Sequence, residues 1–316
     1  MSAFDPEQIR RALWRLDLSV YAPLRSPLSD YCHHYGLDFE NELPVRHYCG
    51  YFEAAGFRLA AHAFLPEQAR GTVFIVHGYL DHAGLYRHLI RDCLNRGFAV
   101  FIYDLPGHGL STGERVSIGE FQQYQEVLNE ALAIYRHQLP TPLYAVGQST
   151  GGAILMDHVL TARARGKAPA FKKVLLLAPL VRPAQWTQIR FGYWLIRRLK
   201  PSVPRVFRAN SSDEDFLRFV REDDPLQDRI VPMGWIGALK RWVAYMHTLP
   251  ACDFPVVLVQ GYKDETVDWR YNLRFVQGHF KVERFFNLPE ASHQLANERE
   301  DLRQPVHQAL AVLLAS

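Results

Sequence analysis

The feature that most constrains this chain is a regular alternation between short apolar runs and longer segments of helical character. The apolar runs lie at residues 71–78, 98–103, 142–148, 172–179, 254–261 and 282–289. The helical segments that separate them lie at residues 84–96, 119–138, 151–164, 267–278 and 299–315. Short continuous apolar runs are typical of strands that are buried on both faces. The alternation therefore predicts a mostly parallel central sheet covered by helices on both faces.

Two further stretches extend this sheet and indicate where its chemistry should lie. Residues 45–53 and 57–66 flank Ala54-Ala55-Gly56 and predict a β-hairpin. Right-handed crossovers bring the carboxyl ends of parallel strands to one edge of the sheet. Functional side chains are therefore expected in the loops that follow the strands.

Composition excludes several classes of protein. The chain has 316 residues, of which 48% are hydrophobic and 22% charged, so it can bury a substantial core without a metal or disulfide. A net charge of +3 is too small to argue for a nucleic-acid partner. No apolar run approaches the ~20 residues that a membrane-spanning helix requires, and the charged N-terminus lacks a secretory leader.

The segment between residues 180 and 250 interrupts the alternation. Its first part, 180–210, carries seven Lys or Arg residues and no acid, whereas 211–228 is acidic. A segment that leaves one sheet edge and returns to it is typical of an inserted helical cap. We therefore predict an N-terminal extension at 1–44, a core at 45–179 and 251–316, and a cap at 180–250.

The basic run Arg197, Arg198 and Lys200 has two interpretations. It could contact an anionic lipid surface, or it could pair with the acidic stretch at 211–228. We favour the pairing within the chain.

The extension itself is expected to begin with a helix. Apolar Ile9, Leu13, Leu16 and Val20 have helical spacing within residues 7–20. Packing of this helix on the protein body is favoured, and an interfacial membrane helix is the alternative, since Trp14 and several arginines would suit one. Residues 22–44 are predicted to form an irregular connection.

The four cysteines give no sign of a disulfide framework or a metal site. Cys32, Cys49, Cys93 and Cys252 are scattered, without a CxxC pair or a zinc-like spacing of Cys and His. Scattered cysteines of this kind indicate a reduced, cytoplasmic protein. If the protein contacts a membrane, we expect it to do so at the inner face. No metal ion or cofactor is expected.

The decisive motif is Gly147-Gln148-Ser149-Thr150-Gly151-Gly152, placed between a buried strand and a helix. G-x-S-x-G in this context is typical of a nucleophile elbow, in which a tight turn exposes the serine at the strand end. The following helix N-terminus would favour a developing oxyanion. A Gly/Ser turn without catalysis is the alternative interpretation.

A serine hydroxyl needs a base, which in turn needs a carboxylate to orient it. Asp264 and His293 follow two late strands, in the chain order serine, acid, histidine that goes with this elbow. We therefore predict His293 as the general base and acid, and Asp264 as the group that fixes its tautomer. Asp268 shares the Asp264 loop, but its place at a helix start favours an N-cap role. His158 falls within a helix and is expected to be a packing or surface residue.

The oxyanion hole should combine two backbone amides. Thr150 supplies one, and Tyr79, in the loop after the strand at 71–78, supplies the other. His77 is interpreted as structural support for that loop. A second G-x-S-x-G, Gly109 to Gly113, follows a proline-bearing loop and has no helix directly after it, so a structural turn is expected.

Aromatic residues in the predicted cap bear on the substrate. Trp186, Phe191 and Trp194 could line an acyl pocket, and Trp235 and Trp242 are further candidates. The competing interpretation, that these aromatics form the core of the cap itself, is favoured.

Five segments of the chain resemble, in order, the signature segments of the monoacylglycerol lipase and lysophospholipase family. They are HGYLDHAGLYRHL, YDLPGHGLSTG, GQSTGG, QGYKDETVD and ASHQL. The resemblance covers about residues 45–315 and implies an α/β-hydrolase fold without metal or cofactor, with an apolar acyl tunnel in the cap. It also implies that Ser149, Asp264 and His293 form the triad and that Tyr79 and Thr150 supply the oxyanion amides. Thr150 departs from the family's frequent methionine, and residues 1–44 exceed its usual lead-in.

The expected activity is that of a serine ester hydrolase, a lysophospholipase or monoacylglycerol lipase-like carboxylesterase acting on single-chain lipids. Two alternatives remain: an acyltransferase or peptidase using the same triad, and a non-catalytic binding protein with a hydrolase-like scaffold. Haloalkane dehalogenases share the architecture but use a carboxylate nucleophile, so Ser149 argues against their chemistry.

Overall fold

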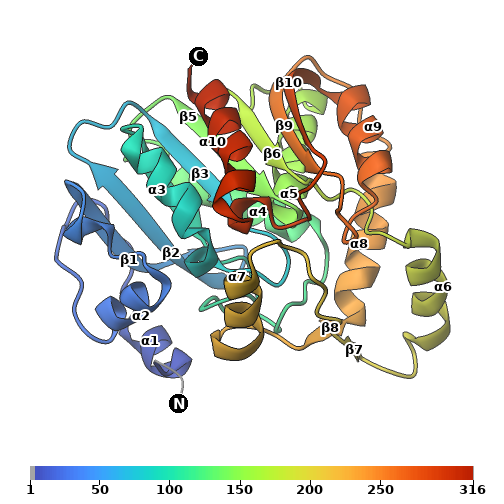
Figure 1. The fold of residues 1–316 in the computed structure, drawn as a ribbon, viewed down its shortest axis with the longest axis horizontal. Coiled ribbons are helices and arrows are strands. Elements are labelled where there is room, and N and C mark those ends of the chain that lie inside the picture. The colour runs from blue at the N-terminus through green and yellow to red at the C-terminus, as the bar shows by residue number, and fades with distance from the viewer. Residues whose placement is uncertain (1–3, 316) are drawn as a thin grey trace.

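A computed structural model describes residues 4–315 and shows an α/β protein built on one large twisted sheet (Figure 1). Within these residues the sheet has eight strands in the order β1-β2-β4-β3-β5-β6-β9-β10. The strands are β1 (Val45–Ala54), β2 (Phe57–Pro66), β3 (Thr72–Val76), β4 (Ala99–Tyr103), β5 (Leu143–Gln148), β6 (Val174–Leu177), β9 (Pro255–Gly261) and β10 (Lys281–Leu288). From β4 to β10 all neighbours are parallel, whereas β1 and β2 form an antiparallel edge. The predicted fold class and the hairpin are confirmed.

Helices cover both faces of the sheet, because successive strand residues point to opposite sides. On β3, Val73 and Ile75 join the apolar cluster under α3 and α10, whereas Phe74 and Val76 join the cluster under α4, α5, α8 and α9. The helices outside the 180–250 segment are α1 (Pro6–Ala12), α2 (Leu28–Tyr35), α3 (Arg87–Asn95), α4 (Gln122–Tyr135), α5 (Thr150–Ala164), α9 (Trp269–His279) and α10 (Glu300–Leu314). The two layers of helix close a continuous core around the parallel strands.

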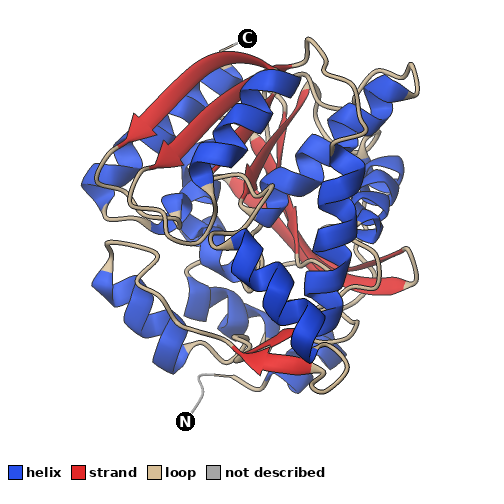
Figure 2. Cartoon of the chain, turned by 90° about the vertical axis from the view of Figure 1, so that its right-hand side faces the viewer, coloured by secondary structure: helices blue, strands red, loops and turns tan. Residues whose placement is uncertain are grey.

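Residues 180–250, called the cap segment below, connect β6 to β9. Their elements are α6 (Trp186–Ile196), β7 (Ser202–Pro204), α7 (Glu214–Arg218), β8 (Ile230–Pro232) and α8 (Met233–Met246). Strands β7 and β8 pair with each other as a separate two-stranded sheet. Figure 2 looks onto the side of the molecule where these helices lie in front of the large sheet. No described helix is both long enough and apolar enough to cross a bilayer.

The helix predicted over residues 7–20 is wrong beyond its first half, since α1 ends at Ala12. The following residues are extended and lie along the exposed edge of β1. The Leu16 amide donates to the Tyr51 carbonyl and the Tyr51 amide to the Trp14 carbonyl, each at 2.7 Å. This contact satisfies edge groups that would otherwise be unpaired, and it outweighs the helical periodicity of the segment.

The irregular connection predicted for residues 22–44 is also wrong in part, because it contains α2. Leu28, Tyr31, Cys32 and Tyr35 have helical spacing and are all buried against the body. Gly36, in the left-handed conformation with φ 64°, ends the helix. The periodicity is too short to be distinguished from loop in a segment rich in proline and serine.

Candidate active site

Ser149 stands between β5 and α5, on a sharp turn of strained backbone. Its φ of 53° and ψ of −112° lie in a region that non-glycine residues rarely adopt. The Ser149 amide donates to the Leu177 carbonyl at 2.9 Å, and its own carbonyl accepts from the amides of Leu180 and Ala153 at 3.0 and 3.1 Å. Hydrogen bonds from the neighbouring strand end and from the helix thus hold the turn in place.

The glycines of the motif are required by close backbone approach. A Cβ on Gly151 would lie 1.8 Å from the carbonyl oxygen of Val76, and one on Gly147 would lie 2.6 Å from the backbone of Gly151. Both distances are shorter than any contact that a real Cβ makes. The sequence pattern around Ser149 is therefore what packs α5 directly onto the ends of β3 and β5.

His293 and Asp264 meet at the same edge of the sheet, on the loops after β10 and β9. The Nδ1 atom of His293 is 2.7 Å from Oδ2 of Asp264. The other carboxylate oxygen, Oδ1, accepts from the amides of Thr266 and Val267 at 2.8 and 3.1 Å. The Gln260 side chain also donates to Oδ2, at 3.1 Å, so the carboxylate is fixed, and it directs the proton of the neutral imidazole to Nδ1. The Nε2 atom is then the free base.

The electrostatics of this pair favour its charged form. Burial alone raises the pKa of Asp264, but the charge and hydrogen bond of His293 and the two amides outweigh it, and the pKa falls below its ordinary value. Burial alone lowers the pKa of His293, but the charge and hydrogen bond of Asp264 outweigh it and raise the pKa. The imidazole can therefore accept a proton more readily than a histidine in water.

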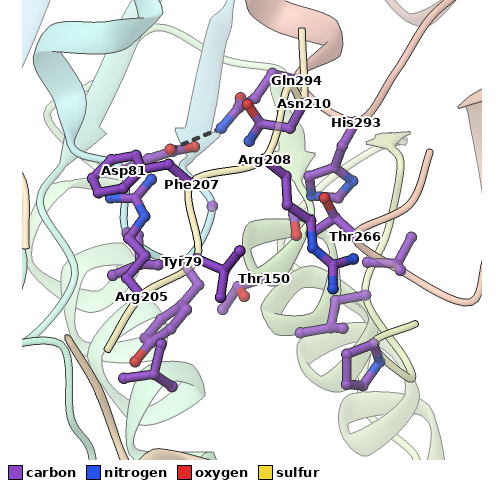
Figure 3. Close-up of a pocket in the computed structure, with 18 of the residues that line it drawn as sticks. Tyr79, Asp81, Thr150, Arg205, Phe207, Arg208, Asn210, Thr266, His293 and Gln294 are labelled. Atoms are coloured by element: carbon purple, nitrogen blue, oxygen red, sulfur yellow. Dashed lines mark hydrogen bonds between the residues drawn. The ribbon is translucent and has the colours of Figure 1, made fainter. Parts of the chain in front are cut away.

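Ser149 and His293 line one cavity of about 300 Å³ (Figure 3). Both are nearly buried, with exposed fractions of 7% and 4%. Within residues 4–315 no hydrogen bond joins the Ser149 hydroxyl to Nε2 of His293; such contacts are often long before a substrate binds. The structure brings the predicted nucleophile and base to one wall of the cavity, with Asp264 behind the base.

The two amides predicted for the oxyanion hole lie beside Ser149. Tyr79 and Thr150 both line the cavity, and neither amide has a protein acceptor in the described part of the chain. Free amides at a helix N-terminus and in an adjacent loop are suited to hold a developing negative charge. The Tyr79 side chain points away from the reaction centre, since its hydroxyl donates to the Val116 carbonyl and its ring stacks on Trp235 at 3.8 Å.

Asp81 is a residue of this site that sequence reasoning missed. Its Oδ2 accepts a hydrogen bond from the Tyr86 hydroxyl, and that hydroxyl in turn accepts one from the Gly78 amide. Its Oδ1 accepts from the Gln294 side chain at 2.9 Å (Figure 3). The carboxyl group is buried, which raises its pKa. Asp81 thus links the Tyr79 loop to the His293 loop. Its place within HGYLDH was the available signal, but the sequence gives no partner for it.

The residues for which structural roles were predicted have them. Nε2 of His77 accepts from the Leu105 amide at 2.8 Å, and burial lowers the pKa of His77 to about 3. The Ser111 hydroxyl donates to the Asp104 carbonyl and accepts from the Ala60 amide, so it is held in a turn. The Asp268 side chain accepts from the Tyr271 amide at the start of α9, as an N-cap does. His158 is buried in α5 and contacts Asn129.

The cap segment contributes the apolar part of the cavity wall, though not through the aromatics predicted first. Trp186 is buried, whereas Phe191 and Trp194 are 65% and 67% exposed, and none of the three lines the cavity. Trp235 does line it, and Trp242 is fully buried and donates to Asp157. The larger apolar cap residues of the wall are Leu180, Ile189, Val206, Phe207, Phe216, Leu217, Val220, Val231 and Trp235. The periodicity of α6 gave no indication of which of its faces turns inward.

The charged stretches of the cap segment do not pair as predicted. Among the described residues, Arg197, Arg198 and Lys200 make no ion pair with the acidic stretch. Arg205 instead donates to the Gln227 side chain and the Asp228 carbonyl and lines the cavity, as do Arg208 and Arg221. The basic run lies on the exposed end of α6, whereas the acids are engaged elsewhere.

The cavity offers no cluster of metal-ligating side chains. In residues 4–315 the one group of His, Cys, Asp or Glu whose ligand atoms converge is Cys32, Cys49 and His62, and none of them lines the cavity. The candidate chemistry at Ser149 is therefore built from a nucleophile, a base with its carboxylate, and two amides.

Comparison with known proteins places this arrangement in a family. Residues 67–300, well over half of the chain, match the family described as serine aminopeptidase S33. The chain belongs to that family. The match includes Ser149, Asp264 and His293 together with the whole cap segment.

Several proteins to which this chain is similar are named as monoglyceride lipases or their homologues. It is 26% identical over 244 residues to a monoglyceride lipase homologue of monkeypox virus, covering 75% of this chain and 86% of the viral protein. It is 28% identical over 212 residues to human monoglyceride lipase, covering 63% and 67% of the two chains. The structure of a soluble variant of monoglyceride lipase from Saccharomyces cerevisiae has a TM-score of 0.70 at 16% identity, covering 84% and 94%. The predicted resemblance and the α/β-hydrolase fold are confirmed.

Proposed function

We propose that this protein hydrolyses carboxylic esters of single-chain lipids through an acyl-enzyme on Ser149. The observation that carries the proposal is the meeting, at one end of a cavity with an apolar wall, of the strained Ser149, the His293–Asp264 pair and two unpaired amides. These are the parts that acyl transfer requires. The names of the relatives, which are lipases, support the ester as the substrate.

The proposed reaction has two halves. Ser149 attacks the ester carbonyl while Nε2 of His293 takes its proton, and the amides of Tyr79 and Thr150 hold the oxyanion. His293 then protonates the leaving alcohol and afterwards activates a water that releases the acyl group. Throughout, Asp264 stabilises the imidazolium and keeps Nδ1 protonated.

The arginines of the cavity favour a lipid with an anionic head group. Arg205, Arg208 and Arg221 line the cavity, and Asp81 is the one acidic side chain among its lining residues. Guanidinium groups bind phosphate oxygens well. We therefore expect a lysophospholipid to be preferred over a neutral monoacylglycerol that has the same acyl chain.

The cap segment also carries the surface that we propose contacts a lipid bilayer. Phe191, Trp194 and Leu195 of α6, and Leu199 just after it, are more than half exposed, next to the basic Arg197 and Arg198. Exposed aromatic and aliphatic groups flanked by cations suit an anionic interface. The apolar side of the N-terminal segment is less suited, because Ile9, Leu13 and Leu16 are buried in the protein.

The testing experiment is acyl release from monoacylglycerol, lysophosphatidylcholine and lysophosphatidate that share one acyl chain. Wild type, Ser149→Ala and the control Ser111→Ala are compared. We expect turnover by wild type and control, none by Ser149→Ala, and the highest kcat/KM with the anionic substrate. Turnover of amino-acid anilides but of no ester would instead favour the peptidase alternative, and no turnover at all would favour a binding protein.

A further inference from the structure

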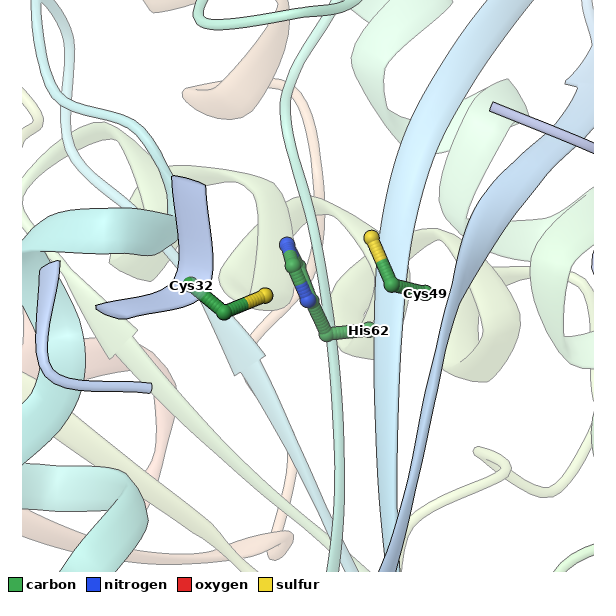
Figure 4. Close-up of side chains that lie close together, drawn as sticks. All are labelled: Cys32, Cys49 and His62. Carbon is green, nitrogen blue, oxygen red and sulfur yellow. The ribbon is translucent and has the colours of Figure 1, made fainter. Parts of the chain in front are cut away.

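Three side chains outside the cavity converge under the N-terminal extension. Cys49 on β1 and His62 on β2 are direct partners in the antiparallel register, so their side chains lie on the same face of the hairpin. Cys32 on α2 covers that face, and Figure 4 shows its sulfur directed toward His62 and Cys49. The two sulfurs and an imidazole nitrogen all lie within 4.8 Å of one another. The three residues are spread over about 30 positions of the sequence and do not have the spacing of a known metal-binding motif. The fold brings them into one cluster.

The imidazole of His62 is oriented by a second histidine. Its Nδ1 lies 2.9 Å from Nε2 of His47, and Nδ1 of His47 lies 3.3 Å from Oε2 of Glu40. The Glu40 carboxylate favours a proton on Nδ1 of His47, so Nε2 of His47 accepts from Nδ1–H of His62. This leaves the lone pair of Nε2 of His62 free. A histidine whose other nitrogen is held in this manner is typical of metal ligands.

The pKa values of the two thiols shift in opposite directions. The hydrogen bond from Cys32 lowers the pKa of the Cys49 thiol, against the effect of burial, and the charge of His62 lowers it further. The same hydrogen bond and burial raise the pKa of Cys32. Two thiols and an imidazole nitrogen that already lie within 4.8 Å of one another form a preformed donor set, and a divalent cation that binds there displaces the thiol protons.

We propose that Cys32, Cys49 and His62 bind a thiolate-preferring transition-metal ion, for which Zn²⁺ is the natural candidate. Two thiolates and one imidazole are ligands that zinc binds in tetrahedral sites, and a water would supply the fourth position. This proposal departs from the sequence-based expectation that the chain has no metal site. The proposal is independent of the esterase activity, since none of the three residues lines the cavity.

The ion would fasten the extension to the sheet and, through it, the cap segment. On α2, three residues after Cys32, the Tyr35 hydroxyl donates to Asp224 at 2.7 Å. Asp224 belongs to the cap segment, and its other oxygen lies 2.9 Å from Nε2 of His82, next to Asp81. A metal that orders α2 therefore supports the buried contact between the cap segment and the loop that carries Tyr79.

The test uses the full chain, reduced and freed of metal by a chelator, and titrated under nitrogen with Co²⁺ alone and then with Zn²⁺ alone. We expect a thiolate-to-cobalt charge-transfer band that saturates at one equivalent and is abolished by zinc. Cys32→Ser and Cys49→Ser should lose the band, whereas the matched control Cys252→Ser, outside the cluster, should keep it. Zinc should also raise the melting temperature of wild type by several degrees, because it binds only the folded chain.

A second measurement needs no variant and so does not depend on whether the substituted chains fold. Because burial shields the thiols of Cys32 and Cys49 in the folded chain, wild type is alkylated near its unfolding midpoint, and peptide mass analysis should then show Cys32 and Cys49 protected by zinc and Cys252 unprotected. The proposal is overturned by equal alkylation with and without zinc, by the absence of the band in reduced wild type, or by its persistence in Cys49→Ser.

Discussion

The catalytic edge of the sheet and the cap segment above it are built in opposite ways. At the edge, Ser149, Asp264 and His293 are at most 7% exposed, and hydrogen bonds from neighbouring strand ends and loops fix their backbones or side chains. On α6 and just after it, by contrast, Trp194 is 67% exposed and Leu199 78%. The difference shows that the residues assigned to the reaction are buried and held by many contacts. The side chains proposed to meet lipid are exposed and have few contacts.

The first way to break this comparison is to remove the nucleophile. Ser149→Ala should lower kcat by at least about 10⁴-fold, because the remaining groups have nothing to attack the ester with. The measurement is single-substrate acyl release at saturating lipid. Ser111→Ala, in the other G-x-S-x-G, is the control and should retain wild-type turnover; a comparable loss there would mean that the wrong motif was assigned.

The second way to test the comparison is to remove the carboxylate that orients His293. Asp264→Asn should lower kcat/KM by about 10⁴-fold, because the imidazole loses both its tautomer and the partner of its charged form. The neutral imidazole is the active form, so the rate of wild type should rise with pH through the His293 pKa. Asp264 raises that pKa, so the acidic limb should lie above the usual histidine range.

The pH profile of Asp264→Asn tests the direction in which Asp264 shifts the pKa of His293. Without the negative charge of Asp264 the imidazolium is less stable, so the acidic limb of Asp264→Asn should move to lower pH. Asp268→Asn, on the same loop, should leave the limb in place because Asp268 caps α9. A limb that stays put in Asp264→Asn would contradict the assigned pair.

The third compares two glycines, one in each region. Gly151→Ala should destabilise the protein by about 3 kcal/mol, because its Cβ would overlap the Val76 carbonyl. Gly192→Ala, within α6, meets no atom within 4 Å and should stabilise the helix by up to about 1 kcal/mol. Urea unfolding of the two variants measures both effects, and equal destabilisation would remove the distinction between the regions.

The smallest effects are expected from the tryptophans of the cap segment. Trp235→Ala should lower kcat/KM on a short soluble ester by about 10-fold, since the ring of Tyr79 loses its stacking partner. Trp194→Ala should change this value little, yet weaken sedimentation with anionic vesicles. If Trp194→Ala impaired the soluble ester as much as Trp235→Ala, the exposed residue would have to reach the site.

The contrast also explains how far sequence reasoning could go. Ser149, Asp264 and His293 lie shortly after strand ends, where an apolar run marks the position, and for Ser149 and Asp264 a nearby glycine marks it as well. The partners of Asp81, by comparison, come from an adjacent helix and from a loop more than two hundred residues away, which no local pattern encodes. The same holds for Cys32, Cys49 and His62, whose convergence depends on the register of β1 against β2 and on the docking of α2.

The predictions that failed did so where periodicity competes with tertiary contact. Residues 13–20 have helical spacing, yet Leu16 and its neighbours pair with β1 because the sheet edge offers unmatched backbone groups. In α6 the three aromatic candidates for the acyl pocket do not line the cavity, since Trp186 is buried elsewhere and Phe191 and Trp194 are exposed; spacing defines the faces of a helix but not which one is buried. The substrate-facing residues of the cap segment therefore required the structure.

The measurement that tests the central claim most directly is the trapping of the acyl group on the protein. Wild type is mixed with a lysophospholipid, quenched in acid within the first turnover, and digested for peptide mass analysis. The account predicts one acyl group, on the peptide that contains Ser149, and none in Ser149→Ala. Ester turnover with the acyl group on Ser111, or with no acylated serine at any time, would contradict it.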